Sequence, residues 1–289
     1  MNGILNLHKP AGFTSFDCVA IARRLTGEKK IGHTGTLDPQ ATGVLPLCIG
    51  KATRLLEYMD DAPKTYVAGC QLGLTTNTQD IWGDILCDRR SEIGSLTREN
   101  AEKVLRSFEG EIQQKPPVFS AIKVKGKKLY EYARSGREVD IPVRTVTVHS
   151  IRMLEWNGPE EPFTIEVTCS RGTYIRSICH DLGEALGCGA CMSSLVRSAT
   201  CGYRIEEAVR LEDLREMTRS QIEALLDPPE TAVRHMDRIE LDPAKEILFV
   251  NGNPLWSEGI AAGEGDHAVF CEGRLLGISK GKFISKVLK

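Results

Sequence analysis

The segment that carries the strongest structural information reads Gly32-His33-Thr34-Gly35-Thr36-Leu37-Asp38-Pro39-Gln40-Ala41-Thr42-Gly43-Val44-Leu45-Pro46. Its glycines and prolines are too closely spaced for a long helix, and its polar residues argue against a buried strand. We therefore expect a structured loop region over residues 29–53. Structured loops on a rigid scaffold are where catalytic residues are commonly found.

A phosphate-binding P-loop is one reading of this segment, because Gly50 and Lys51 follow Gly43. That motif needs four residues between its glycines and a Ser or Thr after the lysine. Six residues intervene in this chain and Ala52 follows the lysine, so a P-loop is excluded. The remaining candidate for a functional residue in this segment is Asp38. It precedes a proline, which favours an extended conformation of the residue before it. Judged by residue type alone, such an aspartate is more often a turn former than a catalyst.

The flanking sequence predicts a mixed α/β (α+β) domain. Thr14-Ser15-Phe16-Asp17 marks a helix start, with a hydroxyl cap and an acid three positions on, and Gly27 ends that helix. Strands are expected at residues 66–72, 143–154 and 163–169, and further helices at 98–108, 174–186 and within 211–226. These elements interleave without a regular βαβ rhythm, so we expect a mixed, largely antiparallel sheet.

A domain boundary is expected in the proline-rich segment between Asp227 and Pro243. The residues beyond it contain several glycines and short β-like runs such as 267–271. We therefore expect a domain over residues 1–236 and a small β-rich domain over residues 237–289.

The overall charge gives no sign of a nucleic-acid partner, since 37 Lys and Arg oppose 39 Asp and Glu. The composition, 41% hydrophobic and 26% charged, is typical of a soluble globular protein. No apolar run approaches the roughly 18 to 20 residues that span a bilayer, and the first residues do not resemble a secretory signal. We expect a cytoplasmic protein without a membrane partner.

Local charge is more informative than net charge. Between Lys115 and Arg137 there are seven basic residues against the single acid Glu131, interleaved with Phe119, Tyr130 and Tyr132. Cations beside aromatic rings suit nucleic acid, because phosphates attract the charge and bases stack on the rings. The alternative is a solvated surface hairpin rich in lysine.

Ten cysteines are scattered through the chain, and we expect reduced thiols. Cys188 and Cys191 have the CxxC spacing of zinc ligands, with Cys179 and His180 upstream. A structural zinc site normally shows two spaced ligand pairs. Cys179 and His180 are adjacent in a predicted helix, so their side chains diverge, and the pattern favours no metal.

Extended through Arg54, the glycine-rich segment resembles the signature of the bacterial tRNA pseudouridine-55 synthases, the TruB family. Four further segments resemble that family's motifs in the family's order: the Lys-Pro motif at 7–15, the tyrosine strand at 64–66, the RNA-gripping insertion around 114–130, and the arginine motif at 169–183, with Leu195-Val196-Arg197 beyond it. Together these segments span about residues 4 to 205.

The resemblance implies that Asp38 is the catalytic aspartate, Tyr66 the active-site aromatic and Arg176 the basic partner of Asp38. Without it, Tyr66 would be taken for a buried sheet tyrosine and Arg176 for an ordinary ion pair. The family's reaction breaks the bond between C1′ and N1 of uridine, rotates the base and rejoins it through C5. No metal, redox cofactor or nucleotide energy source is implied.

The resemblance also implies substrate-binding roles outside the catalytic trio. His33 would help to open the T loop of tRNA so that the target uridine flips out, Lys9 would support the active-site loops, and Leu195 would pack against the flipped base. The insertion, about residues 112–142, would grip RNA through Lys123, Lys125, Lys127, Lys128 and Tyr130. The expected partner is the T arm of tRNA, with no obligate protein partner, and the chain is expected to be a monomer.

The resemblance further implies a pseudouridine-synthase fold followed by a PUA-like RNA-binding domain at residues 237–289. Two alternatives remain open: a tRNA-binding or folding protein without catalysis, and a pseudouridine synthase with another RNA target.

Overall fold

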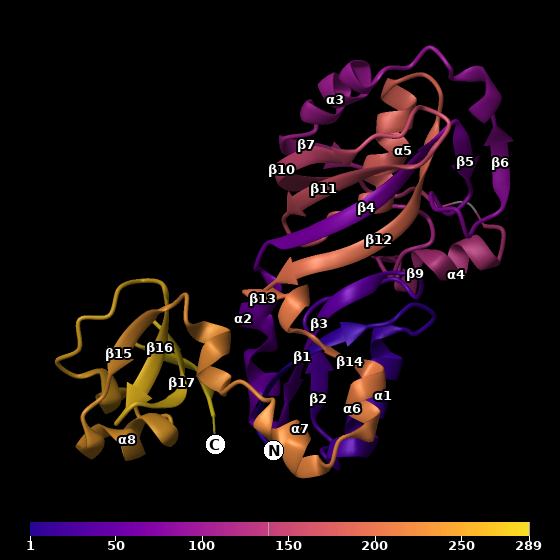
Figure 1. The fold of residues 1–289 in the computed structure, drawn as a ribbon. Helices are drawn as coiled ribbons and strands as arrows, with labels where there is room; N and C mark the ends of the chain where they lie inside the picture. The colour runs from indigo at the N-terminus through magenta and orange to yellow at the C-terminus, as the bar shows by residue number, and fades with distance from the viewer. Residues whose placement is uncertain (138, 289) are drawn as a thin grey trace. The chain divides into compact units, whose positions relative to one another are not determined.

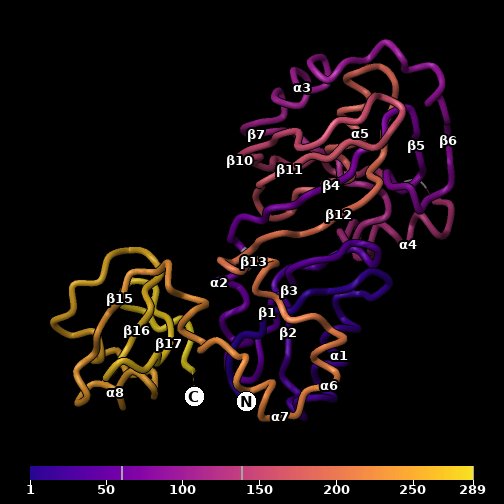
Figure 2. Tube along the Cα trace, viewed as in Figure 1, coloured from indigo at the N-terminus to yellow at the C-terminus, as the bar shows by residue number. Residues whose placement is uncertain are grey.

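The computed structural model describes residues 1–137 and 139–288, so Glu138 of the predicted insertion lies outside the described residues. The chain forms two compact units, each of which contains its own strands (Figures 1 and 2). Unit 1 comprises residues 1–39, 44–61 and 206–289, and unit 2 comprises residues 40–43 and 62–205. No helix of the described chain is both long and apolar enough to cross a membrane.

Unit 2 is built on an antiparallel sheet in the strand order β12-β4-β11-β10-β7. These strands span Ala190–Thr200, Lys64–Leu72, Phe163–Cys169, Arg144–Glu155 and Gly110–Gln114, respectively. The short β13 (Tyr203–Arg204) pairs with β12, and the start of β3 (Thr42–Ile49) pairs with β12 in parallel. The helices α5 (Ile175–Ala185) and α3 (Arg98–Arg106) pack on this sheet, as Figure 1 shows.

Two small hairpins complete unit 2. The first joins β5 (Leu74–Thr76) to β6 (Ile85–Asp88) and is followed by the 3-10 helix η2 (Arg90–Glu92). The second joins β8 (Lys123–Val124) to β9 (Lys127–Lys128) and leads directly into α4 (Leu129–Arg134). The second hairpin and α4 lie in the predicted insertion.

Unit 1 contains the strands β14-β1-β3, with β2 paired to β3. Here β1 spans Gly3–Lys9, β2 spans Ile31–His33 and β14 spans Val209–Arg210. An apolar core joins these strands to α1 (Ser15–Thr26), α6 (Leu211–Glu216) and α7 (Arg219–Ala224). After β3 the chain forms η1 (Gly50–Leu55) and α2 (Leu56–Asp60), and later η3 (Ile205–Glu207) and η4 (Pro229–Val233).

The last residues of unit 1 form a separate four-stranded sheet in the order β15-β16-β17-β18. Its strands span Asp237–Glu240, Asp266–Cys271, Arg274–Lys280 and Phe283–Val287. They enclose their own apolar core with α8 (Pro243–Val250) and η5 (Pro254–Ser257), in which Phe249 and Trp256 meet edge to face. A β-rich C-terminal part is thus confirmed, whereas the boundary at residue 237 and the PUA likeness stay predictions.

The predicted fold class is confirmed, since the large sheet is mixed and most of its strand pairs are antiparallel. The first helix has the predicted ends: Thr14 and Asp17 form a capping box, and Gly27 closes the helix in the left-handed conformation. The predicted strand at 163–169 is also confirmed without change.

The expectation of a loop over residues 29–53 is wrong for much of that range. Residues 31–33 and 42–49 are strands, and β3 is buried along nearly its whole length. Pro46 lies within β3, and although it has no N–H to donate, its carbonyl accepts a hydrogen bond from the Thr34 amide at 3.1 Å. Residues 34–41, between β2 and β3, do form a loop, and this loop contains Asp38.

Candidate functional site

Asp38 belongs to unit 1 and lies in the loop at residues 34–41, and its side chain is half-buried. Both neighbours of Asp38 are held by hydrogen bonds. The Leu37 amide donates to Ser15 Oγ at 2.9 Å, and the Pro39 carbonyl accepts from the Gly12 amide at 2.9 Å. The backbone that carries this carboxylate is therefore fixed on both sides by the segment that starts α1.

Lys9 strengthens the same anchor. This last residue of β1 is completely buried, and its ammonium donates to the carbonyl oxygens of Pro10 at 2.9 Å and Pro39 at 3.0 Å. A buried ammonium is tolerated only when such acceptors replace its water. The side chain thus bonds the loop of Asp38 to the end of β1, and the role expected for Lys9 in the site stays a prediction. His33 ends β2, directly before the loop, and is half-buried.

Tyr66 and Leu195 lie on neighbouring strands of unit 2. Tyr66 is on β4, opposite Val167 of β11 and Arg197 of β12, and its side chain is buried. Leu195 of β12 lies opposite Ala68 and is also buried. The sheet therefore brings these two predicted site residues together on adjacent strands.

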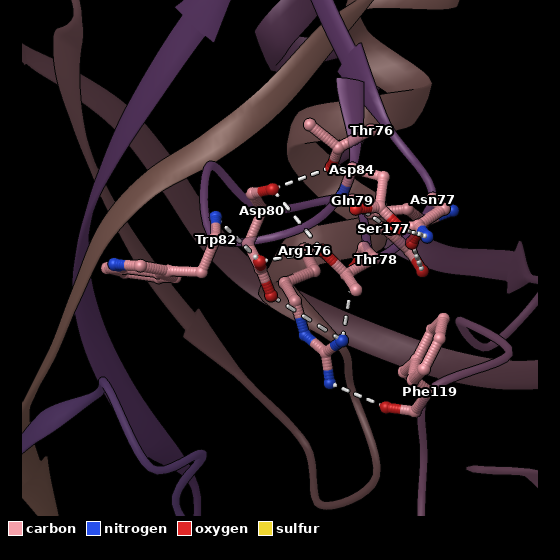
Figure 3. A network of polar contacts seen from close by, with 10 residues as sticks. All are labelled: Thr76, Asn77, Thr78, Gln79, Asp80, Trp82, Asp84, Phe119, Arg176 and Ser177. Atoms are coloured by element: carbon pink, nitrogen blue, oxygen red, sulfur yellow. Dashed lines mark hydrogen bonds and ion pairs between the residues drawn. The ribbon is translucent and has the colours of Figure 1, made fainter. Parts of the chain in front are cut away.

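Arg176 extends from the first turn of α5 and is almost completely buried. Figure 3 shows its guanidinium between the turn at residues 76–84 and Phe119. One guanidinium nitrogen donates to the Thr78 carbonyl at 3.1 Å and the other to the Phe119 carbonyl at 3.1 Å. The guanidinium also lies 3.8 Å from the Asp80 carboxylate.

Asp80 is a site residue that the sequence reasoning missed. Its carboxylate accepts hydrogen bonds from Thr78 Oγ1 at 2.7 Å and from the Trp82 amide at 3.2 Å, in addition to its ion pair with Arg176 (Figure 3). A buried arginine needs a nearby anion, because a lone buried charge is very unfavourable. The available signal was an acid in a polar turn soon after the strand of Tyr66.

The basic residues of the insertion lie around a tight turn. Lys125 and Gly126 both have positive φ, 50° and 82°, and join β8 to β9 in a two-residue hairpin. Lys123, Lys125 and Lys127 are exposed, and Lys128 is half-buried. The Lys128 ammonium and the Arg134 guanidinium each lie 5.5 Å from the centroid of the Tyr130 ring. The insertion therefore presents cations and an aromatic ring on one small surface.

The described residues contain no group of three or more His, Cys, Asp or Glu side chains that could hold a metal ion. All ten cysteines are free thiols. Burial raises the pKa of the Cys191 thiol to about 12. A hydrogen bond with Cys179, together with burial, raises the pKa of the Cys70 thiol. With these raised pKa values, both thiols are protonated near neutral pH.

The predicted site residues thus form two sets. Unit 1 contains Lys9, His33 and Asp38, while unit 2 contains Tyr66, Arg176, Leu195 and the insertion. The roles assigned to these residues, including the pairing of Asp38 with Arg176, stay predictions.

Comparison with known proteins identifies the family. The model for the TruB family pseudouridylate synthase (N terminal domain) matches residues 23–175, and the model for the tRNA pseudouridylate synthase B C-terminal domain matches residues 176–234. The tRNA pseudouridine synthase B of Azoarcus sp. (strain BH72) is 43% identical over 280 residues, covering 97% of this chain and 91% of that protein. The protein of the same name from Geobacillus kaustophilus (strain HTA426) is 47% identical over 257 residues, covering 87% and 90%.

Solved structures agree with this assignment. A chain in the crystal structure of a Cbf5-Nop10-Gar1 complex is 29% identical to this one, with a TM-score of 0.76 over 99% of this chain and 85% of that chain. A chain in an H/ACA RNP bound to a substrate RNA has a TM-score of 0.72 at 28% identity, over 98% of this chain and 79% of that chain. The sequence matches, which span most of the chain, and the matching fold together show that this chain belongs to the TruB family of pseudouridylate synthases, which are isomerases.

Proposed function

We propose that this chain isomerises uridine to pseudouridine at position 55 in the T loop of tRNA, with the Asp38 carboxylate as its catalytic group. The similar proteins named tRNA pseudouridine synthase B support the substrate class. The observation that carries the proposal is the anchoring of Asp38: Ser15 holds Leu37, and Lys9 and Gly12 both hold the Pro39 carbonyl. A reacting carboxylate has to be held in position, and a loose surface turn would not do this.

The chemistry needs one well-placed carboxylate. The C1′–N1 bond of uridine breaks, the base rotates, and a C1′–C5 bond forms, while C5 loses a proton and N1 gains one. Atoms and electrons balance within the nucleotide. Asp38 acts either as the nucleophile at C1′ or as the base that gives a glycal, and both routes require the same side chain.

The other residues have supporting roles in this proposal. Tyr66 stacks on the uracil, Leu195 packs against the base, and His33 helps to displace the uridine from the T loop. Arg176 is the basic partner of Asp38, and its permanently charged guanidinium favours an ionised carboxylate. The exposed lysines of the insertion and Tyr130 hold the RNA backbone and bases, and residues 237–289 form a PUA-like RNA-binding domain.

The test is to incubate unmodified tRNA with the wild-type protein, with Asp38→Asn and with Asp213→Asn, and then to map pseudouridine. Asp213 is an exposed acid of α6 in the same unit and serves as the control. We expect modification at position 55 by the wild type and by Asp213→Asn, and none by Asp38→Asn. Normal turnover by Asp38→Asn would remove the catalytic assignment. Modification only at another site would indicate a different RNA target, and binding without modification would indicate a non-catalytic tRNA-binding protein.

A further inference from the structure

The root of the insertion is bonded directly to the start of helix α5. Gln114, the last residue of β7, is 1% exposed. Its Oε1 accepts from the Tyr174 amide at 2.8 Å, and its Nε2 donates to the Tyr174 carbonyl at 3.0 Å. Tyr174 is the N-cap residue of α5. The Gln114 amide therefore holds the residue from which the helix of Arg176 begins.

Ser177 makes a second connection between the same two segments. Its side chain is completely buried, and its Oγ lies 3.1 Å from the Lys115 carbonyl and 2.9 Å from the Gln79 side-chain oxygen. One hydroxyl proton serves only one of two acceptors at a time. If the Gln79 amide is turned over, its Nε2 donates to Oγ and both contacts are satisfied. In Figure 3, Ser177 lies beside Gln79, in the turn that also contains Asp80.

Arg176 makes the third connection, through its hydrogen bond to the Phe119 carbonyl. The side chain of Tyr174 packs against Ile122, Leu129 and Ile141, the small apolar core of the insertion. Three residues at the start of α5 thus contact the insertion. Two of them, Arg176 and Ser177, also contact the 76–84 turn.

We propose that Gln114 and Ser177 are positioning residues that fix the Arg176 guanidinium relative to the insertion. RNA binding by the insertion is thereby coupled to the position of this guanidinium. This inference rests on the proposed function of Arg176 as the partner of the catalytic carboxylate. The insertion has a small apolar core, and Gln114, Lys115 and Phe119 bond it to the start of α5. These bonds are made to Arg176 itself, through the Phe119 carbonyl, and to its neighbours Tyr174 and Ser177.

The test compares Ser177→Ala and Gln114→Ala with Gln71→Ala. Gln71 is a matched control, because it is a buried glutamine of the same unit whose Nε2 donates to the Leu72 and Glu160 carbonyls, both of which lie outside α5. For each variant, single-turnover pseudouridine formation and tRNA binding are measured separately, with thermal unfolding as the check on folding.

We expect the single-turnover rate of Ser177→Ala and Gln114→Ala to fall by about 10- to 100-fold, since small misplacements of a catalytic group have effects of this size. The Kd for tRNA should change by less than about threefold, because the lysines remain. A rate equal to that of Gln71→Ala, or a loss that appears only in Kd, overturns the proposal.

A double-mutant cycle separates positioning from general damage. Arg176→Lys removes the guanidinium and, with it, the contacts that this group makes on two sides. In this background, Ser177→Ala should have almost no further effect on the rate of pseudouridine formation. Additive losses would mean that Ser177 acts independently of Arg176, and would overturn the proposal. The rates are measured at whichever uridine the wild type modifies, so a target other than position 55 refutes the proposed substrate but not this coupling.

Discussion

The guanidinium of Arg176 lies 3.8 Å from the carboxylate of Asp80, and the two side chains are only 6% and 13% exposed. Both Asp80 oxygens are occupied, one by Thr78 and Trp82 and the other by the guanidinium. Removing one charge of a buried ion pair is costly, because the remaining charge loses a counter-charge in a medium of low dielectric. Asp80 therefore contributes to compensating the buried charge of Arg176 in this position.

Asp80→Asn should lower the unfolding free energy by about 1 to 3 kcal/mol and slow pseudouridine formation by at least about tenfold. Asparagine still accepts the bonds from Thr78 and Trp82, so the substitution removes mainly charge. Urea unfolding and single-turnover assays measure the two effects. The control is Asp84→Asn, an exposed acid of the same turn. If both variants behaved alike, the buried pair would have no special role.

Lys9→Met should destabilise the protein by about 2 kcal/mol and reduce activity, because the Pro10 and Pro39 carbonyls lose a charged donor. Methionine has similar length and fills the same buried space. Urea unfolding, together with single-turnover assays, tests this expectation. Lys51→Met changes an exposed lysine in the same unit and should be neutral. Full activity in Lys9→Met would show that the Asp38 loop does not depend on this ammonium.

Replacing Lys123, Lys125, Lys127 and Lys128 together by glutamine should weaken tRNA binding and flatten its salt dependence. Each phosphate contact contributes roughly 0.7 to 0.9 to the slope of log K against log salt. If all four lysines contact phosphates, the slope decreases by about 3. Binding measured over a series of salt concentrations gives this value, with Lys103→Gln on α3 as the control. An unchanged slope would remove these lysines from the RNA interface.

Gly43→Ala should destabilise unit 2 by about 3 kcal/mol or more. Gly43 has φ of 106°, and an added Cβ would lie 2.2 Å from the Arg197 carbonyl oxygen and 2.8 Å from the Arg197 amide nitrogen. The obstructing atoms are backbone of a paired strand and cannot move away cheaply. Gly187→Ala is the control, since it also has positive φ but no atom within 4 Å, and left-handed strain alone costs about 1 to 2 kcal/mol. Equal urea midpoints for the two variants would contradict the steric argument.

Asp181→Asn should lower the pKa of His180. The Asp181 carboxylate lies 3.4 Å from Nδ1 of His180 and raises this pKa above its usual 6.5. Because the folded-state pKa is the higher one, the ion pair stabilises the fold below pH 6.5. That contribution is lost as pH rises through the folded-state pKa. NMR titration of the imidazole, assigned with His180→Gln, measures the pKa in both proteins. An unchanged titration curve would show that the carboxylate has no influence.

Local sequence was sufficient for several elements. The hydroxyl and acid of Thr14 and Asp17 and the glycine at position 27 define α1, because capping depends on residues close in the chain. The alternation over residues 163–169 defines β11, since one face is buried and the other is not. The same reasoning failed for β3, which is buried almost throughout and therefore shows no alternation.

By itself, the sequence determined the family, the mixed fold and the predicted roles of Asp38, Tyr66 and Arg176, because ordered motifs do not depend on how the chain folds. Only the tertiary structure brought together residues that are distant in sequence. Arg176 binds the Thr78 carbonyl from 98 positions away, and Tyr174 binds Gln114 from 60 positions away. Buried charges and buried amides need partners, and no local pattern specifies which residue across the fold supplies them.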